Sequence, residues 1–267
     1  MSPDPRMKTP TDRFAQLPSS LARQTKIVRL GEVPALLAHP DWETPAPTVL
    51  WMHGRTVHKE LDPGRYLRWM RAGIATCAID LPGHGERFDR ELQSPERTLH
   101  VVEQAVGEVD GVVEAITSGE YAGLFDPERL AIGGMSAGGM VTLRRLGDEH
   151  PFVCAAVEST AGDFSQMPSY NGRYPQELID SLDPIKHMDN RRAIPMLALH
   201  SEKDEWVPVS AIRDFIEALR PRSEEAGVEL TLRTWPETGA PYEHAGFGKV
   251  ATQAKDEQLA FFQRNLV

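Results

Sequence analysis

A serine between small residues is the first candidate for chemistry in this 267-residue chain. The run Gly134–Gly138 reads Gly-Met-Ser-Ala-Gly, follows the apolar run Leu130–Ile132 and precedes a stretch with helical periodicity. Small residues on both sides of a serine permit the sharp strand-to-helix turn that exposes its hydroxyl. The free N–H groups of the new helix then point to the same place. The pattern therefore predicts Ser136 as a nucleophile.

A glycine-rich phosphate loop is the alternative interpretation of the same residues. A Walker-type loop needs a lysine after its glycines, and a dinucleotide-binding loop needs glycine where Met135 stands. The sequence has neither feature. The position between a predicted strand and a predicted helix therefore favours the nucleophile.

A serine nucleophile needs a base to take its proton and a carboxylate to orient that base. In hydrolases that carry the serine on such a turn, the carboxylate follows it in the chain and the histidine comes last. Asp204 lies in the loop just after the apolar run Met196–His200, where a carboxylate could face the serine. Glu202 and Glu205 are the alternatives in the same loop.

His244 is the candidate base. It is the one histidine C-terminal to His200, and it lies in a loop between the run that ends at Trp235 and a final helical stretch. A surface histidine is the alternative for any lone loop histidine. The order along the chain and the loop context favour the base.

Two backbone N–H groups are the candidates for an oxyanion hole. Ala137 follows the nucleophile directly, and Arg55 lies in the loop after the apolar run Thr48–His53. Gly54 allows a close approach of the backbone there, and we expect His53 to brace the loop. The Arg55 side chain could clamp an acidic substrate group or form a surface ion pair.

Eight short apolar, β-rich runs alternate with segments of helical periodicity, and these elements must position the candidate residues. The runs are Lys26–Leu30, Val33–His39, Thr48–His53, Ile74–Asp80, Arg129–Gly133, Val153–Glu158, Met196–His200 and Glu229–Trp235. The helical segments are Tyr66–Ala72, Leu99–Thr117, Ala137–Leu146, Ser210–Leu219 and Gln253–Arg264. Apolar residues at consecutive positions are typical of parallel strands with helices on both faces.

The order of these elements predicts an α/β fold with one mostly parallel sheet of about eight strands. The first two runs are separated by Gly31-Glu32, which indicates an antiparallel hairpin at the N-terminal side. Ligands of such sheets bind beyond the carboxyl ends of the strands, where the candidate residues lie.

Two segments fall outside the alternating pattern. Residues 1–20 are polar with four prolines, which predicts a flexible leader before a single domain at 21–267. Residues 159–194 have mixed polarity and no clear strand, so we expect a small cap over the active site. The apolar side chains of this segment suffice to wall a small pocket, which predicts a preference for short acyl groups.

The composition excludes several classes of partner. The net charge of -10 argues against nucleic acid and anionic membranes, which both favour basic surfaces. No stretch approaches the roughly 20 apolar residues that span a bilayer, and the first residues lack the apolar region of a secretory signal. We expect a cytoplasmic protein with a small-molecule ester as its partner, and a homodimer is an open alternative to a monomer.

Two other groups of residues are predicted to have no catalytic role. Cys77 and Cys154 lie within apolar runs, which favours reduced core thiols over a disulfide or a nucleophile. Asp80 and His84 lie four residues apart, but no further residues with metal-ligand spacing accompany them. We expect no metal and no cofactor.

Taken together, these motifs resemble the α/β-hydrolase superfamily, in particular its dienelactone-hydrolase-like and prolyl-oligopeptidase-like esterase branch. The matching pieces are His53-Gly54, the run Asp80–Arg87, Gly134–Gly138, the loop with Asp204 and Val207-Pro208, and His244. The resemblance implies the α/β-hydrolase fold, a triad of Ser136, Asp204 and His244, and an oxyanion hole formed by Arg55 and Ala137. Two positions depart from the family pattern: Ser201 stands where glycine is frequent, and Arg55 where a small or aromatic residue is frequent.

The motifs and the resemblance predict a serine esterase that cleaves short-chain carboxylic esters through an acyl-enzyme. A short-peptide or thioester hydrolase is the alternative within the same chemistry. A non-catalytic ligand-binding protein on the hydrolase scaffold is the alternative from another class. Peptidases of this branch usually carry an added propeller domain, for which 267 residues leave no room, so esters are favoured.

Overall fold

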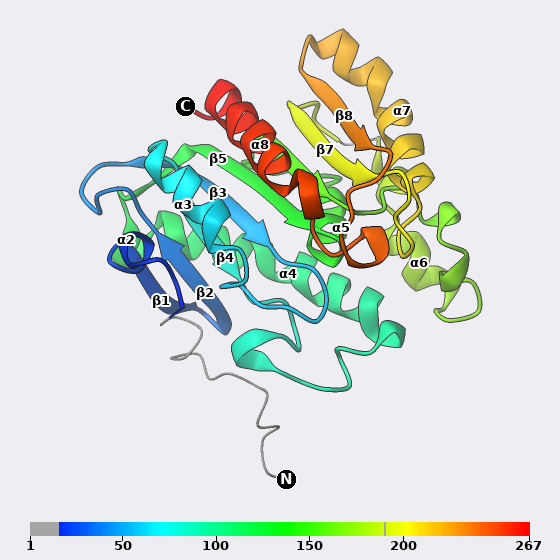
Figure 1. The fold of residues 1–267 in the computed structure, drawn as a ribbon, viewed down its shortest axis with the longest axis horizontal. Coiled ribbons are helices and arrows are strands. Elements are labelled where there is room, and N and C mark those ends of the chain that lie inside the picture. Colours follow the sequence, from blue (N-terminus) through cyan, green and yellow to red (C-terminus); the bar gives the residue numbers. More distant parts are fainter. Residues whose placement is uncertain (1–15, 190) are drawn as a thin grey trace.

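The computed structural model describes residues 16–189 and 191–267, which form one eight-stranded sheet with helices on both faces (Figure 1). The strands are β1 (Thr25–Leu30), β2 (Val33–Ala38), β3 (Ala46–Met52), β4 (Ala75–Ile79), β5 (Phe125–Met135), β6 (Cys154–Glu158), β7 (Met196–Ser201) and β8 (Leu230–Trp235). Their order in the sheet is β1-β2-β4-β3-β5-β6-β7-β8. β2 pairs antiparallel with β1 and β4, and the other neighbours are parallel. The predicted α/β-hydrolase fold with an N-terminal antiparallel hairpin is confirmed.

Helices cover both faces of the sheet. They are α2 (Ser19–Ala22), α3 (Pro63–Arg71), α4 (Thr98–Thr117), α5 (Ala137–Arg145), α6 (Gln176–Leu182), α7 (Val209–Ala226) and α8 (Ala251–Asn265). The 3₁₀ turns are η1 (Gly85–Arg87), η2 (Pro95–Arg97), η3 (Gly119–Tyr121), η4 (Phe164–Gln166), η5 (Pro168–Tyr170), η6 (Pro184–His187), η7 (Pro241–Glu243) and η8 (Gly248–Val250). α4, α5 and α7 contribute to one apolar cluster, and α2, α3 and α8 contribute to the other (Figure 1).

The central strands are apolar at consecutive positions because both of their faces are covered. All residues of β3 are buried. Leu50 and Met52 belong to the cluster with α4 and α5, whereas Val49 and Trp51 belong to the cluster with α3 and α8. Side chains of a strand alternate between the faces of a sheet. Each large apolar side chain buried in this way stabilises the fold by about 1.5–3 kcal/mol.

Cys77 and Cys154 are free thiols in the core. Cys77 lies on β4 and Cys154 on β6, and β3 and β5 lie between these strands. Strands are about 4.8 Å apart, so the separation far exceeds the Cα–Cα span of a disulfide, about 4.4–6.8 Å. Burial raises the pKa of both thiols, which makes them poor nucleophiles.

Both segments outside the alternating pattern contribute to the core. The predicted leader at 1–20 falls mostly on residues 1–15, outside the described residues, whereas Leu17 of the same segment is buried in the cluster with α2, α3 and α8. In the segment 159–194, Phe164, Tyr170 and Ile179 are buried in the cluster with α4 and α5. The ring of Tyr170 lies edge-on to Phe164, with centroids 5.4 Å apart.

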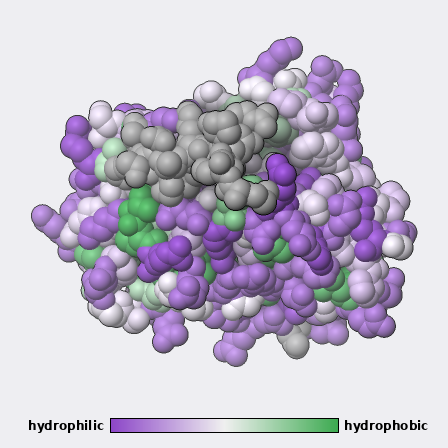
Figure 2. Space-filling model, turned by 90° about the horizontal axis from the view of Figure 1, so that it is seen from below, coloured by the Kyte–Doolittle hydropathy of each residue, from purple (hydrophilic) through white to green (hydrophobic). Residues whose placement is uncertain are grey.

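The surface is mainly hydrophilic on the face shown in Figure 2, where apolar residues are scattered among polar ones. Charged residues make up 25% of the sequence. Among the described helices, none is both long and apolar enough to cross a membrane.

Candidate active site

Ser136 lies on a sharp turn between β5 and α5. Its φ of 53° and ψ of -115° place it where residues other than glycine are rare. The flanking glycines make the turn possible: a Cβ on Gly134 would lie 2.4 Å from the Gly138 carbonyl carbon, and one on Gly138 would lie 2.2 Å from the Met52 carbonyl oxygen. The Ser136 N–H donates to the Glu158 carbonyl oxygen at 2.8 Å. The turn therefore needs both glycines.

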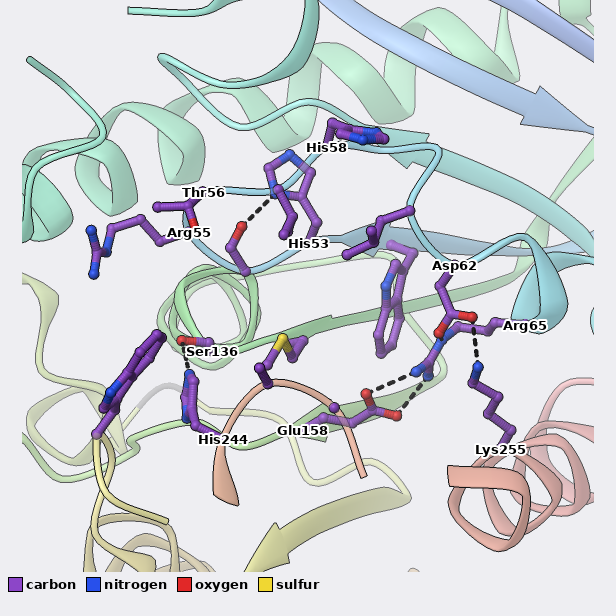
Figure 3. Close-up of a pocket in the computed structure, with 18 of the residues that line it drawn as sticks. His53, Arg55, Thr56, His58, Asp62, Arg65, Ser136, Glu158, His244 and Lys255 are labelled. Carbon is purple, nitrogen blue, oxygen red and sulfur yellow. Dashed lines mark hydrogen bonds and ion pairs between the residues drawn. The ribbon is translucent and has the colours of Figure 1, made fainter. Parts of the chain in front are cut away.

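His244 bridges the other two residues predicted for the triad. Its Nε2 lies 2.9 Å from Ser136 Oγ (Figure 3), and its Nδ1 lies 2.8 Å from Asp204 Oδ2. The second oxygen of Asp204 accepts the backbone N–H groups of Trp206 at 2.9 Å and Val207 at 2.8 Å. A carboxylate on Nδ1–H leaves the lone pair of Nε2 directed at the serine. The structure thus brings the three predicted side chains together in the order that proton transfer requires.

Of the three acidic side chains in the loop after β7, Asp204 is the one that contacts His244. The Asp204 side chain is fully buried, whereas Glu202 and Glu205 are exposed. Glu202 accepts the hydroxyl of Thr234 at 2.8 Å. The geometry therefore favours Asp204 over both alternatives.

Three further residues around His244 were not predicted from the sequence. The ring of Trp206 lies 4.8 Å from the His244 ring, centroid to centroid. His200 Nε2 donates to the Val207 carbonyl oxygen at 2.9 Å, and burial lowers the pKa of His200. The third is Glu243. Its position next to His244 in the sequence was the one feature that could have indicated a role near the histidine.

The Glu243 carboxylate holds the loop that carries His244. It accepts the Ser201 hydroxyl at 2.6 Å, the N–H and the hydroxyl of Thr238 at 2.7 Å each, and the Gly239 N–H at 2.6 Å. Partial burial opposes ionisation, but these hydrogen bonds lower the pKa of Glu243 to about 2. Ser201, which departs from the family pattern, thus links the end of β7 to the histidine loop.

The two predicted oxyanion donors lie beside Ser136. Ala137 is the first residue of α5, where backbone N–H groups have no acceptor within the helix. Arg55 lines the same cavity as Ser136, in the loop after β3. Its guanidinium donates to the Gln93 carbonyl oxygen at 2.7 Å. The role of these two backbone N–H groups as oxyanion donors stays a prediction.

His53 occupies the brace position expected for it. Its Nδ1–H donates to the Gly54 carbonyl oxygen at 2.6 Å, and its Nε2 accepts the Leu81 N–H at 3.0 Å. Burial lowers the pKa of His53 to about 4, so the ring is neutral at pH 7. These bonds tie the loop after β3 to the loop after β4.

The Asp80 carboxylate joins the loop after β4 to the loop after β3. It accepts the backbone N–H of Lys59, the Lys59 ammonium and the Glu86 N–H, each at 2.9 Å. His84 Nδ1–H donates to the Pro82 carbonyl oxygen at 2.8 Å. Within residues 16–189 and 191–267, no group of three His, Cys, Asp or Glu side chains could hold a metal ion.

A cavity of about 360 Å³ opens beside Ser136. Figure 3 shows Ser136 and His244 on one side of it and four charged side chains on the other. The four are Asp62, Arg65, Glu158 and Lys255. Its apolar lining is formed mainly by Trp51, Val57, Leu61, Tyr66, Met135 and Trp206. None of the lining residues belongs to the described part of 159–194. Thr160 of this segment donates its hydroxyl to the Ser136 carbonyl oxygen at 2.8 Å, and the cap over the active site stays a prediction.

Comparisons with known proteins agree with this fold. Residues 66–267 match the model of the prolyl oligopeptidase family. Esterase YjfP of Escherichia coli (strain K12) is 25% identical over 255 residues, which cover 89% of this chain and 97% of that protein.

Two solved structures show the shared fold. TT1662 from Thermus thermophilus has a TM-score of 0.70 at 22% identity, over 90% of this chain and 96% of that chain. The puromycin-hydrolyzing peptidase of Mycobacterium tuberculosis has a TM-score of 0.72 at 22% identity, over 94% of this chain. The chain spans 42% of the length of that peptidase.

Proposed function

The chain belongs to the prolyl oligopeptidase family and is a serine hydrolase, and we propose that it is an esterase for short-chain carboxylic esters. The observation that carries the proposal is the hydrogen-bonded series from Ser136 through His244 to Asp204 at the edge of a cavity. This arrangement can activate a hydroxyl at neutral pH and stabilise the imidazolium that forms.

The proposed reaction uses an acyl-enzyme. His244 Nε2 takes the proton of Ser136 Oγ while that oxygen attacks the ester carbonyl carbon. The N–H groups of Ala137 and Arg55 stabilise the negative oxygen of the tetrahedral intermediate. The C–O bond to the alcohol then breaks, and His244 returns the proton to the leaving oxygen. Water, activated by the same histidine, releases the acid and restores the serine. Asp204 holds the Nδ1–H throughout.

Two observations support esters with short acyl groups. The relative named an esterase is matched over 97% of its length, whereas the peptidase named above is matched over 42%. The cavity is small, and charged side chains occupy one of its sides. An added methylene gains about 0.8 kcal/mol only where it is buried against apolar groups.

A series of p-nitrophenyl esters from C2 to C12, used below their micelle concentrations, tests the proposal. We expect kcat/KM to be highest from acetyl to butyryl, and the Ser136→Ala variant to be inactive yet folded. A fluorophosphonate probe should label the wild type and not this variant, which distinguishes an enzyme from a binding protein.

The same assay includes acetyl thioesters and aminoacyl p-nitroanilides. A maximum at C8 or above would contradict the short-acyl preference. A larger kcat/KM for a thioester or an anilide than for every ester would replace the esterase by a thioesterase or a peptidase.

A further inference from the structure

Two ion pairs on the side of the cavity opposite Ser136 have no part in the reaction described above. Arg65 and Glu158 are joined by a double contact, Nη1–Oε1 at 2.6 Å and Nη2–Oε2 at 2.9 Å. Lys255 Nζ lies 2.7 Å from Asp62 Oδ1. All four side chains line the cavity (Figure 3). We call them the paired-charge wall.

The two pairs differ in their access to solvent. The side chains of Arg65 and Glu158 are 6% and 3% exposed, so this pair is closed off. Those of Asp62 and Lys255 are 27% and 24% exposed. Asp62 and Lys255 are therefore the members that a ligand in the cavity can touch.

The wall is held in a fixed position relative to the nucleophile. The Arg65 guanidinium also donates to Gln258 Oε1 and lies 4.3 Å from the centroid of the Trp51 ring. The backbone of Glu158 accepts the N–H of Ser136 at 2.8 Å. A group bound at the wall would thus meet a rigid surface at a set position from the serine, which is what selective recognition needs.

The charges of the wall cancel. Arg65 and Lys255 balance Asp62 and Glu158, so an ion that enters loses its hydration without gaining a net opposite charge. The other permanently charged basic side chain of the lining is engaged elsewhere, because Arg55 donates to the Gln93 carbonyl oxygen. Among the lining histidines, His58 pairs with Glu60 and His244 with Asp204. The wall therefore disfavours charged groups of either sign.

An uncharged polar group finds partners at the same place. An ammonium has three N–H donors, and in the described part of the chain Lys255 donates one of them, to Asp62. Arg65 Nε–H donates to Asp62 Oδ2 at 3.0 Å. Each oxygen of the Asp62 carboxylate can accept a further hydrogen bond. A hydroxyl or an amide can donate to Asp62 and accept from Lys255.

We propose that the paired-charge wall is a subsite for an uncharged hydrogen-bonding group on the alcohol part of the ester. The inference rests on the proposed function: a short acyl group fills only the part of the cavity next to Ser136, so the alcohol part of the ester reaches the wall on the other side. The favoured substrates are short-chain esters of alcohols that carry a second hydroxyl or an amide, such as partial esters of polyols.

Four acetate esters with similar four-carbon alcohol parts test this inference, with acetate release followed by titration at constant pH. They are butyl acetate, 4-hydroxybutyl acetate, 4-acetoxybutanoate and 4-(trimethylammonio)butyl acetate. We expect kcat/KM for the hydroxybutyl ester to exceed that for each charged ester at least about tenfold, since burying an unpaired charge costs more than burying a hydroxyl.

Each of two variants gives the neutral wall a net charge. Lys255→Met should lower kcat/KM for 4-hydroxybutyl acetate about tenfold relative to kcat/KM for butyl acetate, the worth of one charge-assisted hydrogen bond. The wall of this variant carries a net negative charge, so its kcat/KM for the trimethylammonium ester should rise. Asp62→Asn gives the wall a net positive charge and should instead raise kcat/KM for 4-acetoxybutanoate. Lys186→Met is the matched control, because Lys186 pairs with Asp180 outside the cavity lining.

The outcomes separate this inference from the proposed function. Hydrolysis of all four esters with no preference, or an unchanged preference in both folded variants, would overturn the subsite and leave the esterase. A wild-type preference for either charged ester would also overturn it. The absence of acetate release from every ester, p-nitrophenyl acetate included, would overturn both.

Discussion

Replacing Gly138 by alanine tests whether the turn at Ser136 is set by steric contact between α5 and β3. A Cβ at this position would lie 2.2 Å from the Met52 carbonyl oxygen and 2.7 Å from the His53 carbonyl oxygen. Ordinary contacts of this kind begin near 3.4 Å. Both obstacles are backbone atoms of β3 and the loop after it, so no side-chain rotation can relieve the clash.

The expected loss of activity follows from how far the start of α5 is displaced. To reach an ordinary contact, the start of α5 must move by about 1 Å relative to β3. Ser136 directly precedes α5, so its Oγ would leave the 2.9 Å contact with His244 Nε2. A misplacement of about 1 Å costs on the order of 100-fold in rate. Overpacking costs about 1–3 kcal/mol of stability in addition.

The assay is kcat/KM for p-nitrophenyl acetate together with the unfolding free energy from urea titration. Gly107→Ala is the control: Gly107 is exposed in α4, and a Cβ added there would have no atom within 4 Å. This variant should keep full activity and gain up to about 1 kcal/mol of stability. A folded Gly138→Ala protein with kcat/KM within about threefold of wild type would refute the steric argument.

Three further predictions concern the surroundings of the triad. Asp204→Asn should lower kcat by about 10³–10⁴ through the wrong histidine tautomer; near-normal kcat beside an inactive Glu202→Gln variant would transfer the role to Glu202. Glu243→Gln should lower kcat about tenfold with little change in KM, because an amide cannot accept all four hydrogen bonds at that position; a changed KM with normal kcat would argue against a positioning role. The folded-state pKa of His53 is about 4 and its ordinary value is 6.5, so its contribution to stability is complete above pH 6.5 and falls as the pH drops towards 4. The wild type should therefore lose about 2 kcal/mol between pH 7 and pH 5 from this group, measured by urea unfolding, and an equal loss in His53→Asn would disprove that assignment.

Features set by nearby residues could be predicted from the sequence. The strands were recognisable because burial on both faces leaves consecutive apolar residues, as in Val49–Met52. The sharp turn at Ser136 was recognisable because the two glycines that permit it, Gly134 and Gly138, lie only four residues apart. The sequence shows directly that both residues are glycine, so no knowledge of contacts with distant residues is needed.

The wall of the cavity could not be predicted in this way. The Arg65–Glu158 pair joins residues 93 positions apart, and the Asp62–Lys255 pair joins residues 193 positions apart. Nothing near either residue in the sequence marks its partner. The segment 159–194 shows the same limit: its composition indicated apolar side chains, but whether they faced the core or a pocket depended on how it packs.

By itself, the sequence determined the α/β pattern, the serine turn and the order in which an acid and a histidine follow it. These features depend on the backbone conformation and the burial of a few neighbouring residues. Both can be predicted from the types of those residues and their spacing. The tertiary structure decided that Asp204, and not Glu202 or Glu205, contacts His244, and that paired charges face Ser136 across the cavity. Both depend on the packing of strands and loops distant in the chain, because an ion pair or a proton relay requires contacts of about 3 Å that spacing along the sequence does not encode.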